Sequence, residues 1–184
     1  MKFIKTAIPD VYIIEPLVFE DDRGYFLESF NLEKFEENVY PIKFLQDNES
    51  KSSRGVLRGL HFQKPPFSQA KIVRCIEGCV MDVAVDIRKG SPTYGKHVAV
   101  ELSGENKRQL FVPRGFAHGF SVLSENAVFA YKVDNTYAPE SDSGIRYDDK
   151  ELNIDWGLNK EEVQLSVKDK NLTFFKDLDS PFKF

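Results

Sequence analysis

A dense run of short strand-like segments constrains this sequence more than any other feature. Turn-forming residues separate the segments, for example Glu77-Gly78, Ser103 to Asn106 and Ser124 to Asn126. The pattern predicts strands over residues 11–19, 24–30, 43–49, 55–63, 72–76, 80–87, 96–102, 109–112, 119–123 and 127–133. Many short strands with few helices are typical of a β-sandwich or a β-barrel.

Residues 81–88 carry the clearest strand pattern. Two sets of side chains alternate along them: Met81, Val83, Val85 and Ile87 against Asp82, Ala84, Asp86 and Arg88. A period of two predicts a half-buried strand. Residues 31–38 predict a short helix with Asn31 as its cap, and residues 161–163 are a weaker helical candidate. We therefore expect one all-β domain over residues 1–184 with a few short helices.

Composition and charge narrow the class of protein. The chain is 41% hydrophobic and 29% charged, which is ordinary for a globular domain, and its net charge is −4. It has no basic stripe for a phosphate backbone, so we do not expect a nucleic-acid partner. No run of about 18 apolar residues predicts a membrane span, and residues 11–19 are too short and polar for a signal segment. The C-x3-C spacing of Cys75 and Cys79 fits two reduced structural thiols, and we expect a cytoplasmic protein.

The segment Gly55 to Gln63 contains two candidate functional residues, Arg58 and His61. On a regular strand they would point to opposite faces, because their separation is odd. Gly59 between them permits a bulge that would turn both side chains toward one cavity. The residue types alone leave other readings open, since a strand histidine is often a structural hydrogen-bonding residue and an arginine is often a solvated surface charge.

Five further residues could take part in chemistry, each with a structural alternative. Lys71 could equally be an exposed lysine of an edge strand. Tyr131 shares a strand face with apolar neighbours, which predicts that it points inward, as a core tyrosine also would. His118 could contact a ligand or be a satisfied core histidine. Lys168 and Asp169 are an adjacent cation and carboxylate in what reads as a polar loop.

The sequence does not favour a metal centre. It contains three histidines, with no H-x-H pair that a following glutamate could complete to a ligand triad. There is also no G-x-S-x-G frame for a serine nucleophile and no glycine-rich phosphate loop. We therefore do not expect a metal.

Several short motifs occur in a specific order along nearly the whole chain, from about Thr6 to about Asn171. They are Asp22 to Phe26, Gln46 to Asn48, Leu57 to Gln63, Lys71 to Arg74, Pro113 to Phe120, Tyr131-Lys132 with Tyr137, Gly144 to Arg146 followed by Asp148-Asp149, and Ser166 to Asp169. Each motif alone is weak, but the ordered set resembles the dTDP-4-dehydrorhamnose 3,5-epimerase family of the cupin superfamily.

The resemblance implies a fold and a cofactor-free mechanism. The fold would be a cupin-type jelly-roll, a double-stranded β-helix barrel, in a homodimer with strand exchange. His61 would be the base that removes protons from C5 and C3 of the hexose, next to the C4 ketone. Asp169 would orient its imidazole, Lys71 would stabilise the enolate oxygen, and Tyr131 would deliver a proton to the opposite face.

The resemblance also implies a nucleotide-sugar site. Its binding residues would be Arg23, Phe26, Glu28, Gln46, Asp47, Asn48, Arg58, His118, Tyr137, Asp142 and Lys168. Arg23 and Glu28 would come from the neighbouring subunit, and Tyr137 would stack on thymine. Arginine and lysine suit the diphosphate. Many family members have glutamate at the position of Asp142, so the shorter side chain is a departure from the pattern.

The leading hypothesis is thus a 3,5-epimerase acting on dTDP-4-dehydro-6-deoxy-D-glucose. One alternative is a relative that inverts one carbon or uses another nucleotide sugar. A non-catalytic cupin that only binds a sugar nucleotide is another alternative, and a metal-dependent cupin enzyme is a third.

Overall fold

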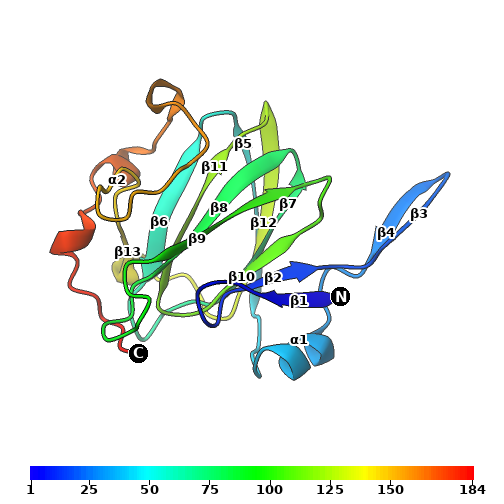
Figure 1. Cartoon of the computed structure of the whole chain (residues 1–184), viewed down its shortest axis with the longest axis horizontal. Coiled ribbons are helices and arrows are strands. Elements are labelled where there is room, and N and C mark those ends of the chain that lie inside the picture. Colours follow the sequence, from blue (N-terminus) through cyan, green and yellow to red (C-terminus); the bar gives the residue numbers. More distant parts are fainter.

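The computed structural model describes residues 1–184, and two facing β-sheets form its body (Figure 1). The six-stranded sheet has the order β1 (Lys2–Lys5), β2 (Tyr12–Glu15), β10 (Gln109–Val112), β7 (Lys71–Glu77), β12 (Asn126–Val133) and β5 (Gln46–Ser53). The five-stranded sheet has the order β13 (Asp142–Gly144), β6 (Leu57–Gln63), β11 (Phe116–Val122), β8 (Cys79–Asp86) and β9 (His97–Ser103). All these strand pairs are antiparallel.

The two sheets pack face to face over an apolar core. Val73 and Phe129 of one sheet pack into the same buried cluster as Val80, Ala84 and Phe120 of the other. This all-β arrangement confirms the predicted cupin-type jelly-roll with few, short helices. The strands that flank the core supply the inward side chains of the cavity described below, so the barrel wall itself is the scaffold of the site.

Strand β8 differs from the prediction of a half-buried strand. Asp82 and Asp86 are fully buried, as are Val83 and Val85 on the other face. The even-numbered residues face the interior between the sheets, whereas the odd-numbered residues are covered by C-terminal residues such as Trp156. The half-buried prediction is therefore wrong: the alternation is real, but later chain covers the second face.

The predicted first helix is present as α1 (Leu32–Asn38), and the Asn31 side chain accepts a hydrogen bond from the Lys34 backbone N–H at 3.1 Å. Phe35 anchors this helix on Phe111 of β10. The candidate at 161–163 is a 3-10 helix, Lys160–Glu162. Two further 3-10 helices, Pro139–Ser141 and Phe175–Asp177, were not predicted.

Some predicted elements have other boundaries. The predicted strand 11–19 is two strands, because Pro16 has no N–H to continue the ladder after β2. The second of these, β3 (Val18–Asp21), pairs with β4 (Gly24–Leu27) in a hairpin that projects away from the two sheets (Figure 1). The strand predicted at 43–49 begins at Gln46. No helix of the chain is long and apolar enough to cross a membrane.

Candidate active site

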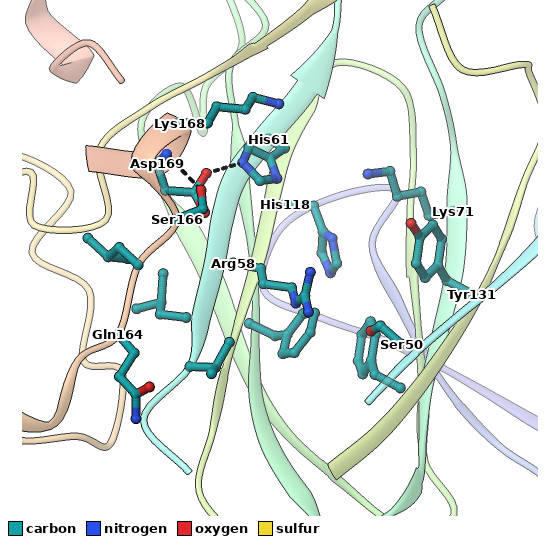
Figure 2. Close-up of a pocket in the computed structure, with 15 residues that line it drawn as sticks. Ser50, Arg58, His61, Lys71, His118, Tyr131, Gln164, Ser166, Lys168 and Asp169 are labelled. Atoms are coloured by element: carbon teal, nitrogen blue, oxygen red, sulfur yellow. Dashed lines mark hydrogen bonds and ion pairs between the residues drawn. The ribbon is translucent and has the colours of Figure 1, made fainter. Parts of the chain in front are cut away.

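A cavity of about 470 Å³ opens between the two sheets, and the close-up in Figure 2 shows its lining. Polar and charged side chains dominate one region of it. The polar and charged lining residues are Ser50, Arg58, His61, Lys71, His118, Tyr131, Gln164, Ser166, Lys168 and Asp169. All four residues predicted to be catalytic therefore line one cavity.

One wall of the cavity carries a histidine–carboxylate pair. His61 Nε2 lies 2.5 Å from Asp169 Oδ1, and the Asp169 side chain is only 4% exposed. Burial opposes ionisation of Asp169, but hydrogen bonds from His61 and from Ser166 outweigh it and hold its pKa below the usual range. The carboxylate fixes Nε2 as the protonated nitrogen, which leaves Nδ1 as the nitrogen free to act on a ligand.

Asp169 is held by a short helix, α2 (Val167–Lys170), that the sequence analysis read as a polar loop. Ser166 caps this helix by accepting a hydrogen bond from the Asp169 backbone N–H at 3.0 Å. The cap sets the direction of the first turn, so the Asp169 side chain points toward β6. The loop prediction is wrong because a four-residue helix shows no periodicity, although the Ser-x-x-Asp signature of a capped start was visible.

The bulge predicted at Gly59 is present. Gly59 has a φ of +123°, and the pairing of β6 with β11 shifts register between His118 and Phe120. Arg58 and His61 consequently both line the cavity. Arg58 donates to the Ser52 hydroxyl at 3.1 Å, so a residue of β5 in the other sheet holds the guanidinium in place.

The opposite wall carries Lys71 and Tyr131, across from His61 and Asp169 in Figure 2. The Lys71 ammonium lies 5.9 Å from the centre of the Tyr131 ring. Burial lowers the pKa of Lys71 to about 8, with Asp142 and Asp82 opposing the shift. Burial also raises the pKa of Tyr131, so its hydroxyl stays protonated at neutral pH. The inward direction predicted for Tyr131 is confirmed.

A second cavity, of about 300 Å³, adjoins the first and shares His61, Lys71, Tyr131 and Lys168 with it. It brings together several of the residues predicted to bind a ligand. Those residues are Gln46, Asn48, Tyr137, Asp142 and Lys168. The Tyr137 hydroxyl donates to Asp142 at 3.0 Å, and the Lys168 ammonium donates to the same carboxylate oxygen. Asp142 thus connects the loop that carries Tyr137 with helix α2.

Four predicted binding residues lie outside both cavities. Asp47 points away on the other face of β5 and pairs with Lys132 at 2.7 Å. Arg23 and Phe26 lie on the projecting β3–β4 hairpin, and Glu28 directly follows it. Arg23 pairs with Asp21, and Glu28 pairs with Lys34 at 2.7 Å. Within one chain, these residues do not reach the cavity.

The structure adds Asp82, which sequence reasoning did not connect with the site. His118 lines the cavity, and its Nε2 lies 3.0 Å from both carboxylate oxygens of Asp82, behind it. The sequence signal for this residue was a charged side chain, Asp82, among the apolar residues of β8. No group of three or more histidine, cysteine and acidic side chains is arranged to hold a metal ion; that the reaction needs no metal stays a prediction.

Comparisons with known proteins agree with this geometry. The family model described as dTDP-4-dehydrorhamnose 3,5-epimerase matches residues 5–177. A protein of that name from Shigella flexneri is 57% identical over 97% of this chain and 98% of its own length. The crystal structure of an enzyme of that name from Elizabethkingia anophelis has a TM-score of 0.92 at 57% identity, covering 96% of this chain and 97% of the other.

A further solved structure contains a sugar nucleotide. It is a dTDP-6-deoxy-D-glucose-3,5-epimerase from Legionella pneumophila in complex with dTDP-4-keto-L-rhamnose. It has a TM-score of 0.95 at 49% identity and covers 100% of this chain and 98% of its own.

The fold and the cavity define a jelly-roll protein with a histidine–carboxylate pair facing a lysine and a tyrosine, and the similar proteins above put it in the isomerase class. The match to the family model and the sequence identities with the named relatives narrow this class to one family. The chain belongs to the dTDP-4-dehydrorhamnose 3,5-epimerase family.

Proposed function

We propose that this chain is a cofactor-free epimerase that inverts C3 and C5 of dTDP-4-dehydro-6-deoxy-D-glucose and yields dTDP-4-dehydro-L-rhamnose for dTDP-L-rhamnose biosynthesis. The observation that carries the proposal is the opposition of two proton-transfer groups across one cavity. His61 with Asp169 lies on one wall and Tyr131 with Lys71 on the other. Inversion of a carbon needs proton removal on one face and proton delivery on the opposite face.

The His61 imidazole is proposed as the base. The hydrogens on C3 and C5 are acidic because each carbon is next to the C4 ketone, so the electron pair left behind is delocalised onto the ketone oxygen. His61 would take the proton on Nδ1, since Nε2 is bonded to Asp169. The resulting imidazolium is then stabilised by the buried carboxylate at 2.5 Å.

Lys71 and Tyr131 are proposed to complete the exchange. The Lys71 ammonium is a fixed cation at the wall where the enolate oxygen would form, and a positioned donor of this kind contributes about 3–4 kcal/mol to transition-state stabilisation in comparable sites. The Tyr131 hydroxyl, protonated at neutral pH, would return a proton to the face opposite His61. The positive charge of Arg58, which acts against the rise in the pKa of Tyr131, would stabilise the phenolate that proton delivery leaves.

The nucleotide is proposed to occupy the adjoining cavity and the mouth beside Arg58. Lys168 and Arg58 supply positive charge for the diphosphate, and arginine can bind phosphate oxygens bidentately. Tyr137 is 57% exposed at the rim, where its ring is free to stack on a base. Gln46 and Asn48 hydrogen-bond to each other at 2.8 Å and present amide groups to the same cavity.

The remaining binding residues are proposed to act in a homodimer. Arg23, Phe26 and Glu28 lie on or beside a hairpin that projects away from the two sheets of its own chain, and Phe26 is 68% exposed. A partner barrel would cover these apolar side chains and bring Arg23 to its nucleotide site. We also propose a reducing compartment, the cytoplasm, because Cys75 and Cys79 are both free thiols.

Incubation of the keto-sugar nucleotide with the protein in deuterium oxide tests this function. We expect deuterium at both C3 and C5 and formation of dTDP-4-dehydro-L-rhamnose, both followed by NMR. Deuterium at only one carbon would support a single-carbon epimerase instead. Ligand binding without exchange at either carbon would identify a non-catalytic sugar-nucleotide-binding protein.

A further inference from the structure

Asp82 is a buried carboxylate for which the proposed reaction has no role so far. Its side chain is fully buried, and both of its oxygens lie 3.0 Å from Nε2 of His118. His118 is the only side chain or backbone group that donates a hydrogen bond to it. Asp82 pairs with Phe120 across β8 and β11, so His118 is its diagonal neighbour on the same face of the sheet.

His118 lies at the centre of the site rather than at its edge. It pairs directly with His61 across β11 and β6, and Figure 2 shows its ring between His61 on one side and Lys71 with Tyr131 on the other. Because Nε2 is bonded to Asp82, Nδ1 is the ring nitrogen left for a ligand in the cavity. Nε2 of His61 is likewise bonded to Asp169, so each of the two histidines is held by a carboxylate of its own.

A buried carboxylate with one hydrogen-bonding partner is a costly way to hold a core histidine. Burying a charge is unfavourable unless another charge compensates it, and a neutral serine or asparagine would satisfy a ring N–H at lower cost. What a carboxylate supplies in addition is negative charge beneath a cavity that gathers Lys71, Lys168 and Arg58.

We propose that Asp82 is a positioning residue for the epimerisation: it fixes the His118 ring with Nδ1 toward the substrate, and its charge keeps the Lys71 ammonium protonated at the enolate oxygen. This inference rests on the function proposed for the same cavity. It assigns Asp82 no contact with substrate, since the His118 ring lies between Asp82 and the cavity.

The charges around Lys71 support the proposal that Asp82 helps to keep the Lys71 ammonium protonated. Burial pulls the pKa of Lys71 down to about 8, while Asp142 and Asp82 both act to raise it and Lys168 lowers it further. The titratable and charged groups around Lys71 come from the neighbouring strands and α2: Asp82, Asp142, Lys168, Tyr131, His61 and His118. Removal of the Asp82 charge should therefore lower the pKa of Lys71 below about 8.

The test compares Asp82→Asn with Asp86→Asn. Asp86 is on the same strand and equally buried, but it bonds to Arg88, Ser91 and Thr93, away from the cavity. We expect Asp82→Asn to lower kcat about 10- to 100-fold, by analogy with the loss of a partner that orients a metal-bound histidine. We also expect the alkaline limb of its kcat/KM profile to move to lower pH. Asp86→Asn should change thermal stability only.

A double variant and a measurement on the unaltered protein complete the test. In a His118→Asn background, Asp82→Asn should cost less in kcat than it does alone, because the orienting role is already lost. Heteronuclear NMR of the unaltered protein should find the His118 proton on Nε2, whether or not the variant folds. Wild-type kcat and pH profile in Asp82→Asn, or an unprotonated His118 Nε2, would overturn the inference. An inactive unaltered protein would instead overturn the proposed function.

Discussion

Tyr131 and His61 lie on opposite walls of the cavity, so the loss of each should have its own signature. Tyr131→Phe removes the proposed acid and leaves the base in place. We expect net epimerisation to fall about 10²–10⁴-fold, with a smaller loss in the initial hydrogen exchange. Parallel measurement of product formation and deuterium uptake checks this. Tyr147→Phe, outside both cavities, is the matched control; equal losses of both rates in Tyr131→Phe would contradict the assignment.

Lys71 should set the alkaline limit of activity. Its pKa is depressed to about 8, so the ammonium is present below that pH and is lost as pH rises through it. We expect kcat/KM, which reports on the free enzyme, to decline above about pH 8. Lys71→Arg should retain part of the activity and lose this limb, because guanidinium stays protonated throughout the range. If the decline of kcat/KM near pH 8 persists in Lys71→Arg, a group other than Lys71 causes it.

At the scale of single residues, the sequence predicted the features that depend on local backbone geometry. The inward face of Tyr131 and the bulge at Gly59 were predictable, because strand parity and glycine conformation depend on neighbouring residues only. Asp82 was not identified as part of the site, since its role depends on His118, which is 36 residues away. The pairing of His61 with Asp169, across 108 residues, was implied by family resemblance and could not come from spacing.

The contact between β6 and β11 positions two of the site's histidines and depends on Gly59. A Cβ at Gly59 would lie 2.6 Å from Gly119 Cα and 2.8 Å from the His118 carbonyl oxygen, and its φ of +123° is unfavourable for any other residue. We expect Gly59→Ala to destabilise the fold by about 1–3 kcal/mol and to lower activity in the folded fraction.

Urea denaturation of Gly59→Ala and Gly90→Ala separates steric contact from backbone strain. Gly90 also has a positive φ, +87°, but a Cβ there would meet nothing within 4 Å. The control should therefore show the smaller loss. Equal destabilisation of the two variants would mean that the close approach of the strands is unimportant.

At the scale of elements, the long strands were predictable and the short elements were not. Strand β12 has eight residues and was predicted within one residue of its observed bounds, whereas β13 and α2 have three and four residues and too little sequence for a periodic pattern. Both short elements contribute to the site, since they carry Asp142 and Asp169. Tertiary contacts with β6 determine their conformation more than local preference does.

The whole molecule should be a dimer in which Arg23 of each subunit lies in the site of the other subunit. The β3–β4 hairpin projects away from its own barrel and leaves Phe19 and Phe26 exposed. We expect sedimentation to give twice the mass of one chain. Arg23→Ala should raise KM with little change in kcat, because Arg23 would bind the nucleotide and not the reacting carbons.

Mixing two impaired variants tests directly whether Arg23 acts in the site of the partner subunit. His61→Asn and Arg23→Ala subunits, mixed and allowed to re-form dimers, should restore sites with normal KM, because one site of each mixed dimer then has both residues intact. Absence of restoration in dimers shown to be mixed would mean that Arg23 acts within its own chain. No local sequence pattern could predict this arrangement, since it depends on how two barrels pack.

The central claim is that His61 removes the proton at both carbons, and deuterium uptake by a His61→Asn variant tests it most directly. Asparagine keeps a polar group of similar size and cannot take up a proton at neutral pH. We predict no deuterium at C3 or C5 while the nucleotide sugar still binds. His97→Asn should exchange normally, because His97 lies outside both cavities. Exchange at the normal rate in His61→Asn would contradict the mechanism.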